Sequence, residues 1–304
     1  MEISYINSFI LSTGVAILLY LFFDVYKTEI QSPRKAIFGT IGLLFAIMAA
    51  YYCFVVEPVT SVLGSGAPSL FNYIFVFITS CLPVVAYWKY IRHVDSAKAE
   101  PLHVLMLAAA LGVVAAFVIN LLGKPLFVGG IKSELTYSFS ESVNIGFLDL
   151  AVPAELAKWL LLLLFLRWNR YYDEYIDGVV YSVSLSLGFT VILSTWFILG
   201  FIDCSGWLFL KKGFVTAFLL IPIHFMSGVL MGYFIAIARK RNKVLNSLFA
   251  LIAAILLDGT ACTMITMIGG RFILNVLVLI CLSILAFMLY NRIYYLLQLD
   301  GVVK

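Results

Sequence analysis

Two charged residues, Glu155 and Lys158, lie in the middle of an apolar stretch that runs from 145 to 166. His224 and Asp258 lie at comparable depth in two later apolar stretches. Ionisable side chains inside a membrane are costly, so they are rare, face inward and usually serve a function. Carboxylates and imidazole bind hard or borderline metals and transfer protons in hydrolysis. These four residues are the candidate catalytic set, and Glu155, His224 and Asp258 are also the candidate metal ligands.

The depth of these residues allows them to meet. At about 1.5 Å per helical residue, Glu155 lies roughly 18 Å, and His224 and Asp258 roughly 22 Å, from the charged ends of their spans. Pro153 and Pro222 each precede a candidate by two residues. Proline bends a helix, and irregular backbone at this depth is tolerated only where it lines a cavity or packs on protein. We therefore expect the three side chains to share one shielded layer.

Small side chains predict where the helices touch. Gly228 and Gly232 share a helix face with His224, and a GxxxG pair lets another backbone approach closely, so His224 is expected to face a neighbouring helix. Two further faces with small residues are Ser182, Ser186, Thr190 and Ser194, and Ala254, Asp258 and Cys262.

Each candidate also has a plainer structural alternative. Glu155 and Lys158 stand three residues apart and could simply neutralise each other. His224 could be a hydrogen-bonded packing residue, and Asp258 could be protonated. Cys262 and the hydroxyl stripe fit packing better than catalysis. The set as a whole favours chemistry more than any single member does.

The elements that must position these residues are membrane-spanning helices. Of the 304 residues, 63% are hydrophobic and 12% charged, whereas soluble domains have about 25% charged residues. The apolar runs have the length that an α-helix needs to cross a bilayer. The predicted fold is all-α, a polytopic transmembrane helix bundle. We expect about nine spans, at 6–23, 37–56, 70–88, 102–123, 145–166, 178–202, 214–238, 245–268 and 272–290.

Lysine and arginine predict the orientation. Of the 20 basic residues, 14 lie in one set of loops and five in the opposite set, with Lys158 inside a span. The positive-inside rule then places the N-terminus outside and the C-terminus in the cytoplasm. The first apolar run is read as an anchor because no basic residue precedes it. The net charge of +4 is explained by these loops, so we expect the lipid bilayer and no nucleic acid as a partner.

Polarity divides the chain into two parts. Residues 1–144 carry few polar residues at membrane depth and are read as scaffold helices, whereas 145–304 hold the candidate site. No separate soluble domain is expected. The outward connection from 123 to 144 is either a lid or a plain surface loop. Five scattered cysteines, Cys53, Cys81, Cys204, Cys262 and Cys281, without a CxxC pair, indicate neither a disulfide framework nor a zinc knuckle.

Five pieces of the second part resemble a known family, the PrsW-like intramembrane proteases, which are related to the CAAX-type proteases. Pro153-Ala154-Glu155-Leu156-Ala157-Lys158 is similar to the E-E-x-x-K signature of that family. The other pieces, in chain order, are the D-G-x-x-Y motif at Asp177–Tyr181, the G-F motif at Gly188-Phe189, the P-x-H helix at Pro222-Ile223-His224, and a last polar helix at Asp258-Gly259.

The resemblance implies cleavage of a transmembrane or juxtamembrane peptide bond in a membrane-protein substrate, in a bacterial plasma membrane. It leaves open a divalent metal such as zinc or a glutamate-activated water without metal. The chain departs from the pattern at Ala154, where the first glutamate is expected, at Leu193 or Ser194, where an acid is expected, and at Asp258 and Cys262 in the last helix.

Three functions therefore stay open from the sequence. The first is an intramembrane peptidase whose activity is weakened or lost because Ala154 and Leu193 replace acids. The second is a non-catalytic pseudoprotease that binds membrane helices around an apolar cavity at these two positions. The third, ranked last because no inverted repeat is visible, is a transporter of ions or small solutes that uses Glu155, Lys158 and Asp258 as a relay.

Overall fold

A computed structural model describes residues 77–94 in part, 99–121, 138–199, 220–240, 242–267 and 272–301. All regular structure in these residues is helical. The predicted spans 6–23 and 37–56, and most of 70–88, lie outside the described residues. The chain forms two compact units, Met1–Tyr90 with Ser194–Ile221, and Ile91–Leu193 with Pro222–Lys304. The candidate site lies in the second unit.

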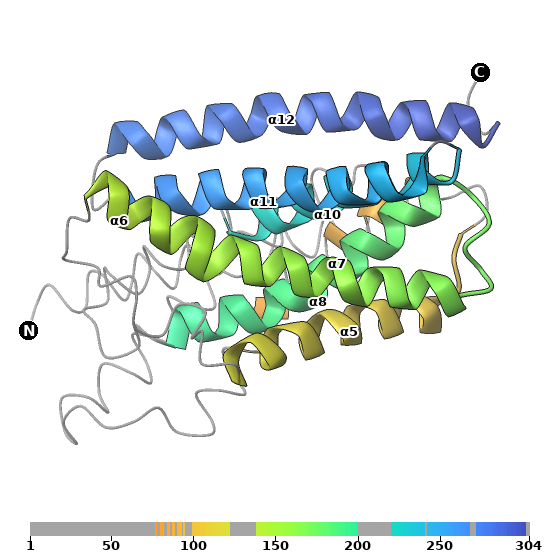
Figure 1. The fold of residues 1–304 in the computed structure, drawn as a ribbon, viewed down its shortest axis with the longest axis horizontal. Helices are drawn as coiled ribbons and strands as arrows, with labels where there is room; N and C mark the ends of the chain where they lie inside the picture. Colours follow the sequence, from red (N-terminus) through yellow and green to blue (C-terminus); the bar gives the residue numbers. More distant parts are fainter. Residues whose placement is uncertain are drawn as a thin grey trace, which may run out of the picture. The chain divides into compact units, whose positions relative to one another are not determined.

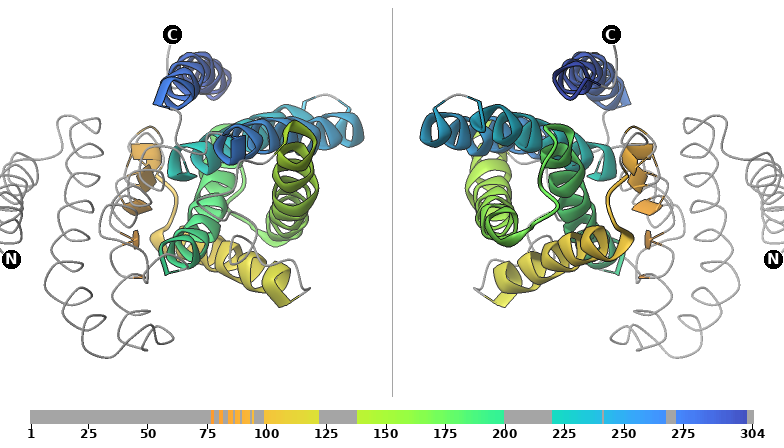
Figure 2. Two further views of the ribbon diagram at one scale, coloured as in Figure 1. Left: turned by 90° about the vertical axis from the view of Figure 1, so that its left-hand side faces the viewer. Right: turned by 90° about the vertical axis from the view of Figure 1, so that its right-hand side faces the viewer.

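Four described helices have the length and apolar composition needed to cross a bilayer. They are α5 (Leu102–Leu121), α8 (Ile176–Leu199), α10 (Ile221–Ala238) and α11 (Lys243–Met267). The predicted helical membrane fold is confirmed for this part of the chain, whereas the count of nine spans and the orientation stay predictions. The last helix, α12 (Phe272–Leu299), lies beside α11 at the outer edge of the unit (Figures 1 and 2).

The predicted fifth span begins earlier than expected. Helix α6 (Phe139–Val143), a π-helical segment η2 (Asn144–Ala151) and α7 (Val152–Trp168) follow one another without a break. Ser138 starts this helix with a capping box, because its hydroxyl accepts from the Glu141 N–H while the Glu141 carboxylate accepts from the Ser138 N–H at 2.8 Å. The prediction that the connection extends to 144 is therefore wrong for 139–144, and residues 122–137 lie outside the described part.

Proline gives a physical reason for the π-helical segment. Pro153 lacks an N–H, and its ring would collide with the carbonyl four residues earlier in a regular α-helix. The chain widens ahead of it, and the Val152 N–H donates to the carbonyl of Phe147, five residues back. Such π-bulges are frequent at functional sites. Glu155 follows directly, so the irregular turn sets the direction of its side chain.

Helix α8 is the buried centre of the second unit, since every residue from 176 to 193 is buried. Glycines bring its neighbours to backbone contact. A Cβ at Gly232 of α10 would collide with the backbone of Gly178 and Val179, and a Cβ at Gly188 would collide with Ala109 of α5. The predicted close packing at the Gly228 and Gly232 face is thus confirmed, and α8 is its partner.

The start of α8 is fixed by carboxylates. The Asp300 side chain, at the end of α12, accepts the N–H groups of Tyr175 and Ile176 at 2.8 and 2.9 Å. Asp177, in the first turn, accepts those of Asp173 and Glu174. Negative groups are favourable at the N-terminus of a helix, where backbone N–H groups lack helical partners.

Candidate active site

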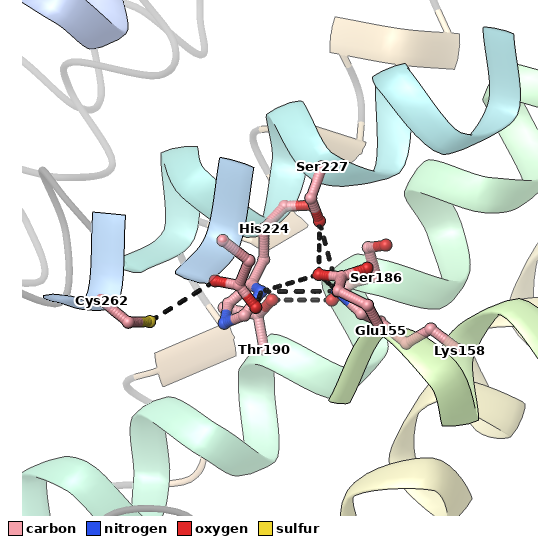
Figure 3. Close-up of polar contacts among 8 residues, drawn as sticks. Glu155, Lys158, Ser186, Thr190, His224, Ser227 and Cys262 are labelled. Atoms are coloured by element: carbon pink, nitrogen blue, oxygen red, sulfur yellow. Dashed lines mark hydrogen bonds and ion pairs between the residues drawn. The ribbon is translucent and has the colours of Figure 1, made fainter. Parts of the chain in front are cut away.

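Three helices bring the predicted residues together. Glu155 and Lys158 come from α7 and His224 from α10 (Figure 3), and Asp258 comes from α11. One ligand atom each of Glu155, His224 and Asp258 lies within 4.8 Å of the others. All four side chains are buried, with at most 2% of the surface exposed. The expectation that these spans converge in one shielded layer is confirmed.

Glu155 is held by one of its two carboxylate oxygens. Its Oε1 accepts from the Lys158 ammonium at 2.6 Å and from the Ser227 hydroxyl at 3.0 Å. Its Oε2 is buried and has no hydrogen-bond partner among the described residues. A buried carboxylate oxygen without a donor is costly. The arrangement therefore leaves Oε2 available for a water, a substrate group or a cation.

His224 lies between the two carboxylates. Its Nδ1 is 3.8 Å from Asp258 Oδ2 and 4.0 Å from Glu155 Oε1. Its Nε2 is buried without a hydrogen-bond partner in the described part of the chain. The ring of Phe189, from the G-F piece on α8, meets the imidazole edge-on with centroids 5.5 Å apart. The imidazole is thus fixed in place while one ring nitrogen stays unused.

Lys158 connects α7 to α10. Its ammonium bonds to Glu155, lies 3.2 Å from the Ser227 hydroxyl and 3.4 Å from His224 Nδ1, and sits 5.2 Å from the centre of the Phe189 ring. The neutralising pair that the plainer alternative describes does exist. It extends beyond one helix, however, because Lys158 also contacts His224 and Ser227 on α10.

Asp258 has a local partner on its own helix. The Cys262 thiol donates to Asp258 Oδ1 at 3.5 Å, and Ala254, Asp258 and Cys262 are all buried, as their shared face predicts. The positions where the family pattern expects acids are apolar and buried, Ala154 at 2% and Leu193 at 1% exposure. No carboxylate stands in for the missing acids at these two positions.

Two contributors were not predicted as site residues. Ser227 is fully buried and binds both Glu155 and Lys158. It stands three residues after His224 on α10, so helical spacing could have placed it on the same face. Phe189 belonged to a quoted motif, but its contact with His224 depends on how α8 and α10 cross, which the sequence does not specify.

Several other polar residues of the sequence lie outside the site. Asp149 and Asn120 are exposed. The hydroxyl stripe of α8 is buried from Ser182 to Ser194, and Ser186 faces Gly228, which fits helix packing. Ser186 and Thr190 of this stripe appear in the close-up of the site, where the Thr190 hydroxyl donates to the Ser186 carbonyl (Figure 3). In the D-G-x-x-Y piece, Asp177 binds the loop before α8, and the Tyr181 hydroxyl donates to Glu100 just before α5. These motif residues join helix ends and do not reach the pocket.

The donor set fits a divalent metal. Two carboxylates and one imidazole are ligand types that zinc accepts in hydrolytic sites. The buried, partnerless Glu155 Oε2 and His224 Nε2 are the observation that supports this fit, since each would otherwise stay unsatisfied. The Lys158 ammonium, 2.6 Å from Glu155, is a fixed positive charge that any such cation would face.

A helical membrane protein with a glutamate, a histidine and an aspartate gathered between its spans belongs to the class of polytopic proteins with a polar centre inside the bilayer. The chain is an integral membrane protein, because four of its described helices are long and apolar enough to cross a bilayer. A family model described as "PrsW family intramembrane metalloprotease" matches residues 100–290. The chain therefore belongs to the PrsW family, as its five motif pieces predict.

Individual relatives agree with the family model. Over 160 residues the chain is 32% identical to Protease PrsW of Bacillus subtilis (strain 168), covering 52% of this chain and 66% of the relative. Over 188 residues it is 30% identical to Protease PrsW of Clostridioides difficile (strain 630), covering 60% and 76%. The chain thus spans about two thirds of the length of the Bacillus protein. No solved structure matches it.

Proposed function

We propose that this chain engages a transmembrane or juxtamembrane segment of another membrane protein and hydrolyses a peptide bond in it. Glu155, His224 and Asp258 form the reacting centre. The observation that carries the proposal is the approach of their ligand atoms to within 4.8 Å in a buried layer between α7, α10 and α11. Because Ala154 and Leu193 replace expected acids, we propose that the activity is weaker than an intact acid set would give.

Each residue has a role in this proposal. Glu155 Oε2 accepts a proton from a water whose oxygen attacks the peptide carbonyl carbon, and it returns the proton to the amide nitrogen as the C–N bond breaks. Lys158 and Ser227 position Glu155 by binding Oε1. Phe189 packs against the His224 ring and keeps it in place.

A divalent metal such as zinc would be held by His224 and Asp258, so that Oε2 of Glu155 stays available as the proton acceptor. When bound, such an ion polarises a carbonyl oxygen and makes a coordinated water more acidic. The family description supports a metal for its members. The alternative, in which Glu155 alone activates the water, needs the same positioning by Lys158 and Ser227.

Reporter cleavage tests this proposal. Purified protein in proteoliposomes is given a membrane-anchored reporter, and products are mapped by mass spectrometry. Glu155→Gln and His224→Ala are each expected to lower cleavage by at least about 100-fold, the usual contribution of proton transfer by a positioned side chain. Glu141→Gln, which changes an exposed glutamate at the start of α6, is the matched control and should keep the wild-type rate. Cleavage unchanged by both site variants rejects the site.

A second candidate function is a pseudoprotease that binds membrane helices without cutting them. Two observations favour it: the Lys158 ammonium occupies one oxygen of Glu155, and apolar side chains stand at 154 and 193. This reading expects no wild-type cleavage and a gain of cleavage in the double variant Ala154→Glu with Leu193→Glu. Wild-type cleavage at an ordinary enzymatic rate excludes it.

We further propose that the whole chain crosses the membrane about nine times, with the N-terminus outside and the C-terminus in the cytoplasm. Residues 1–144 then serve as scaffold helices and 145–304 as the protease-like core. The grouping of Arg167, Arg239 and Lys243 around one groove supports this orientation, because these residues come from loops that the charge count places on one side.

A further inference from the structure

An open groove lies between α7, α10 and α11, away from the reacting centre. Its volume is about 710 Å³, within the usual range for a pocket that binds a small molecule. The walls are apolar along most of their length and include Trp159, Leu163, Ile235 and Leu248. The groove is therefore shaped for an apolar body that lies along the bundle.

Basic side chains gather at the same groove. Arg167 ends α7, Arg239 follows α10 and Lys243 begins α11, and all three line it. All three are exposed. Among the described residues, no carboxylate forms an ion pair with Arg167 or Lys243. The groove thus has two basic side chains, Arg167 and Lys243, that no ion pair among the described residues neutralises.

Arg239 is a rigid member of this set. Its guanidinium donates to the backbone carbonyls of Glu174 at 2.6 Å and Asp173 at 2.8 Å. It also lies over the ring of Tyr172, 4.7 Å from the centroid. These partners are carbonyls and a ring, so they fix the guanidinium without cancelling its charge. On the apolar side of the groove, the Trp159 indole N–H donates a hydrogen bond to the carbonyl of Ser247 at 3.0 Å, and this bond joins α7 to α11.

We infer that this groove binds an anionic phospholipid, with the phosphate at the basic residues and an acyl chain along the apolar wall. Charge complementarity selects the occupant, because a cationic region joined to an apolar wall matches an anionic amphiphile. Basic pockets between transmembrane helices bind acidic headgroups in this way. Val244, which is 71% exposed, and Leu248, which is 44% exposed, continue the apolar wall outward. The inference does not depend on peptidase activity.

Quenching of tryptophan fluorescence by brominated lipid tests the inference. The delipidated full chain in neutral detergent is titrated with phosphatidylglycerol that carries brominated acyl chains, and in parallel with the brominated phosphatidylcholine. Phosphatidylglycerol is expected to quench at lower concentration. Trp159→Phe should remove the saturable part of the quenching, since Trp159 lines the groove.

Charge removal supplies matched variants. Arg167→Gln with Lys243→Gln is expected to raise the half-saturating lipid concentration roughly 10- to 30-fold, the effect of two charges near an anionic headgroup. The control pair, Arg170→Gln with Lys240→Gln, removes the same charge from exposed positions that do not line the groove. Because these residues do not contact the proposed lipid, the half-saturating lipid concentration should stay within about 2-fold of the wild-type value. Ser247→Phe fills the groove without changing charge or adding a tryptophan, and should also abolish the saturable quenching.

Three results would overturn the inference. Equal quenching by the two lipids would show that charge does not select the occupant. An equal loss in both charge-removal pairs would assign the effect to net charge. Displacement of the lipid by a soluble acidic peptide, with no preference for phosphatidylglycerol in its absence, would make the groove a docking site for an acidic juxtamembrane segment.

Discussion

The second unit accommodates positive charge in two different ways, one in its buried middle around Lys158 and one at its basic end, which is formed by Arg167, Arg239 and Lys243. Lys158 is fully buried, and its polar partners are the side chains of Glu155, Ser227 and His224. Arg239 is exposed, and its hydrogen-bond partners are backbone carbonyls. Where water is absent an ionised group needs a charged partner, whereas near water neutral acceptors suffice.

This difference indicates what each region is for. A buried ion pair seldom stabilises a protein more than a well-packed apolar pair of the same size would. The Glu155–Lys158 pair is therefore poorly explained by stability alone, which favours a functional role. The contacts of Arg239, by contrast, join the loop before α8 to the end of α10, so they contribute to stability and also hold the guanidinium at the groove.

The largest effect is expected from breaking the buried pair. Lys158→Met leaves Glu155 buried without its cation and should lower the free energy of unfolding by about 3–5 kcal/mol, the usual cost of removing one partner. The double variant Glu155→Gln with Lys158→Met should recover most of that loss. Unfolding in mixed micelles, followed by circular dichroism, measures both. A single variant as stable as wild type would show that the two groups do not depend on each other.

A smaller effect is expected at the basic end. Arg239→Ala removes two hydrogen bonds and the contacts with the rings of Tyr172 and Tyr175. It should lower the free energy of unfolding by about 1–3 kcal/mol, discounted for its exposure. Arg239→Lys should be more stable than Arg239→Ala but less stable than wild type, because an ammonium cannot donate to both carbonyls in the way the planar guanidinium does. The same unfolding assay applies. A loss as large as that of Lys158→Met would erase the contrast between the two regions.

The smallest effect concerns pH. Burial raises the pKa of Tyr172 to about 12, above its ordinary value of about 10. The unfolded chain therefore loses the Tyr172 proton at a lower pH than the folded chain. The contribution of this group to the free energy of unfolding is present below about pH 10 and is lost as the pH rises towards about 12. Tyr172→Phe should remove this alkaline loss, of the order of 1–2 kcal/mol. Tyr171→Phe changes an exposed neighbour and should not alter this loss of stability at high pH. If the stability of wild type and of Tyr172→Phe fell in the same way as the pH rises, Tyr172 would not be its source.

The sequence predicts the membrane helices and the main site residues for clear physical reasons. Long apolar runs leave few alternatives to helices. Ionisable residues such as Glu155 and Asp258 are conspicuous because lipid excludes them. Their common depth follows from the helical rise, and the structure places them in one layer as that arithmetic predicts.

The remaining features depend on three-dimensional packing. The contacts of Phe189 with His224 and of Asp300 with the start of α8 join residues far apart in the chain. No local pattern specifies such a crossing. The start of α6 could have been found, since Ser138 and Glu141 form a capping-box pattern. The π-helical form of η2 could not, because proline predicts a disturbance of the helix and not its type.

A thiol-bridging measurement tests the convergence of α10 and α11 directly. His224→Cys with Asp258→Cys, in a protein whose native cysteines are replaced by alanine, is treated with mercuric ion and analysed by intact mass spectrometry. The account predicts one bridging mercury per chain. His224→Cys with Leu256→Cys, on an exposed face of α11, should show two singly modified thiols. Equal behaviour of the two pairs would contradict a shared pocket, and with it the proposed reacting centre.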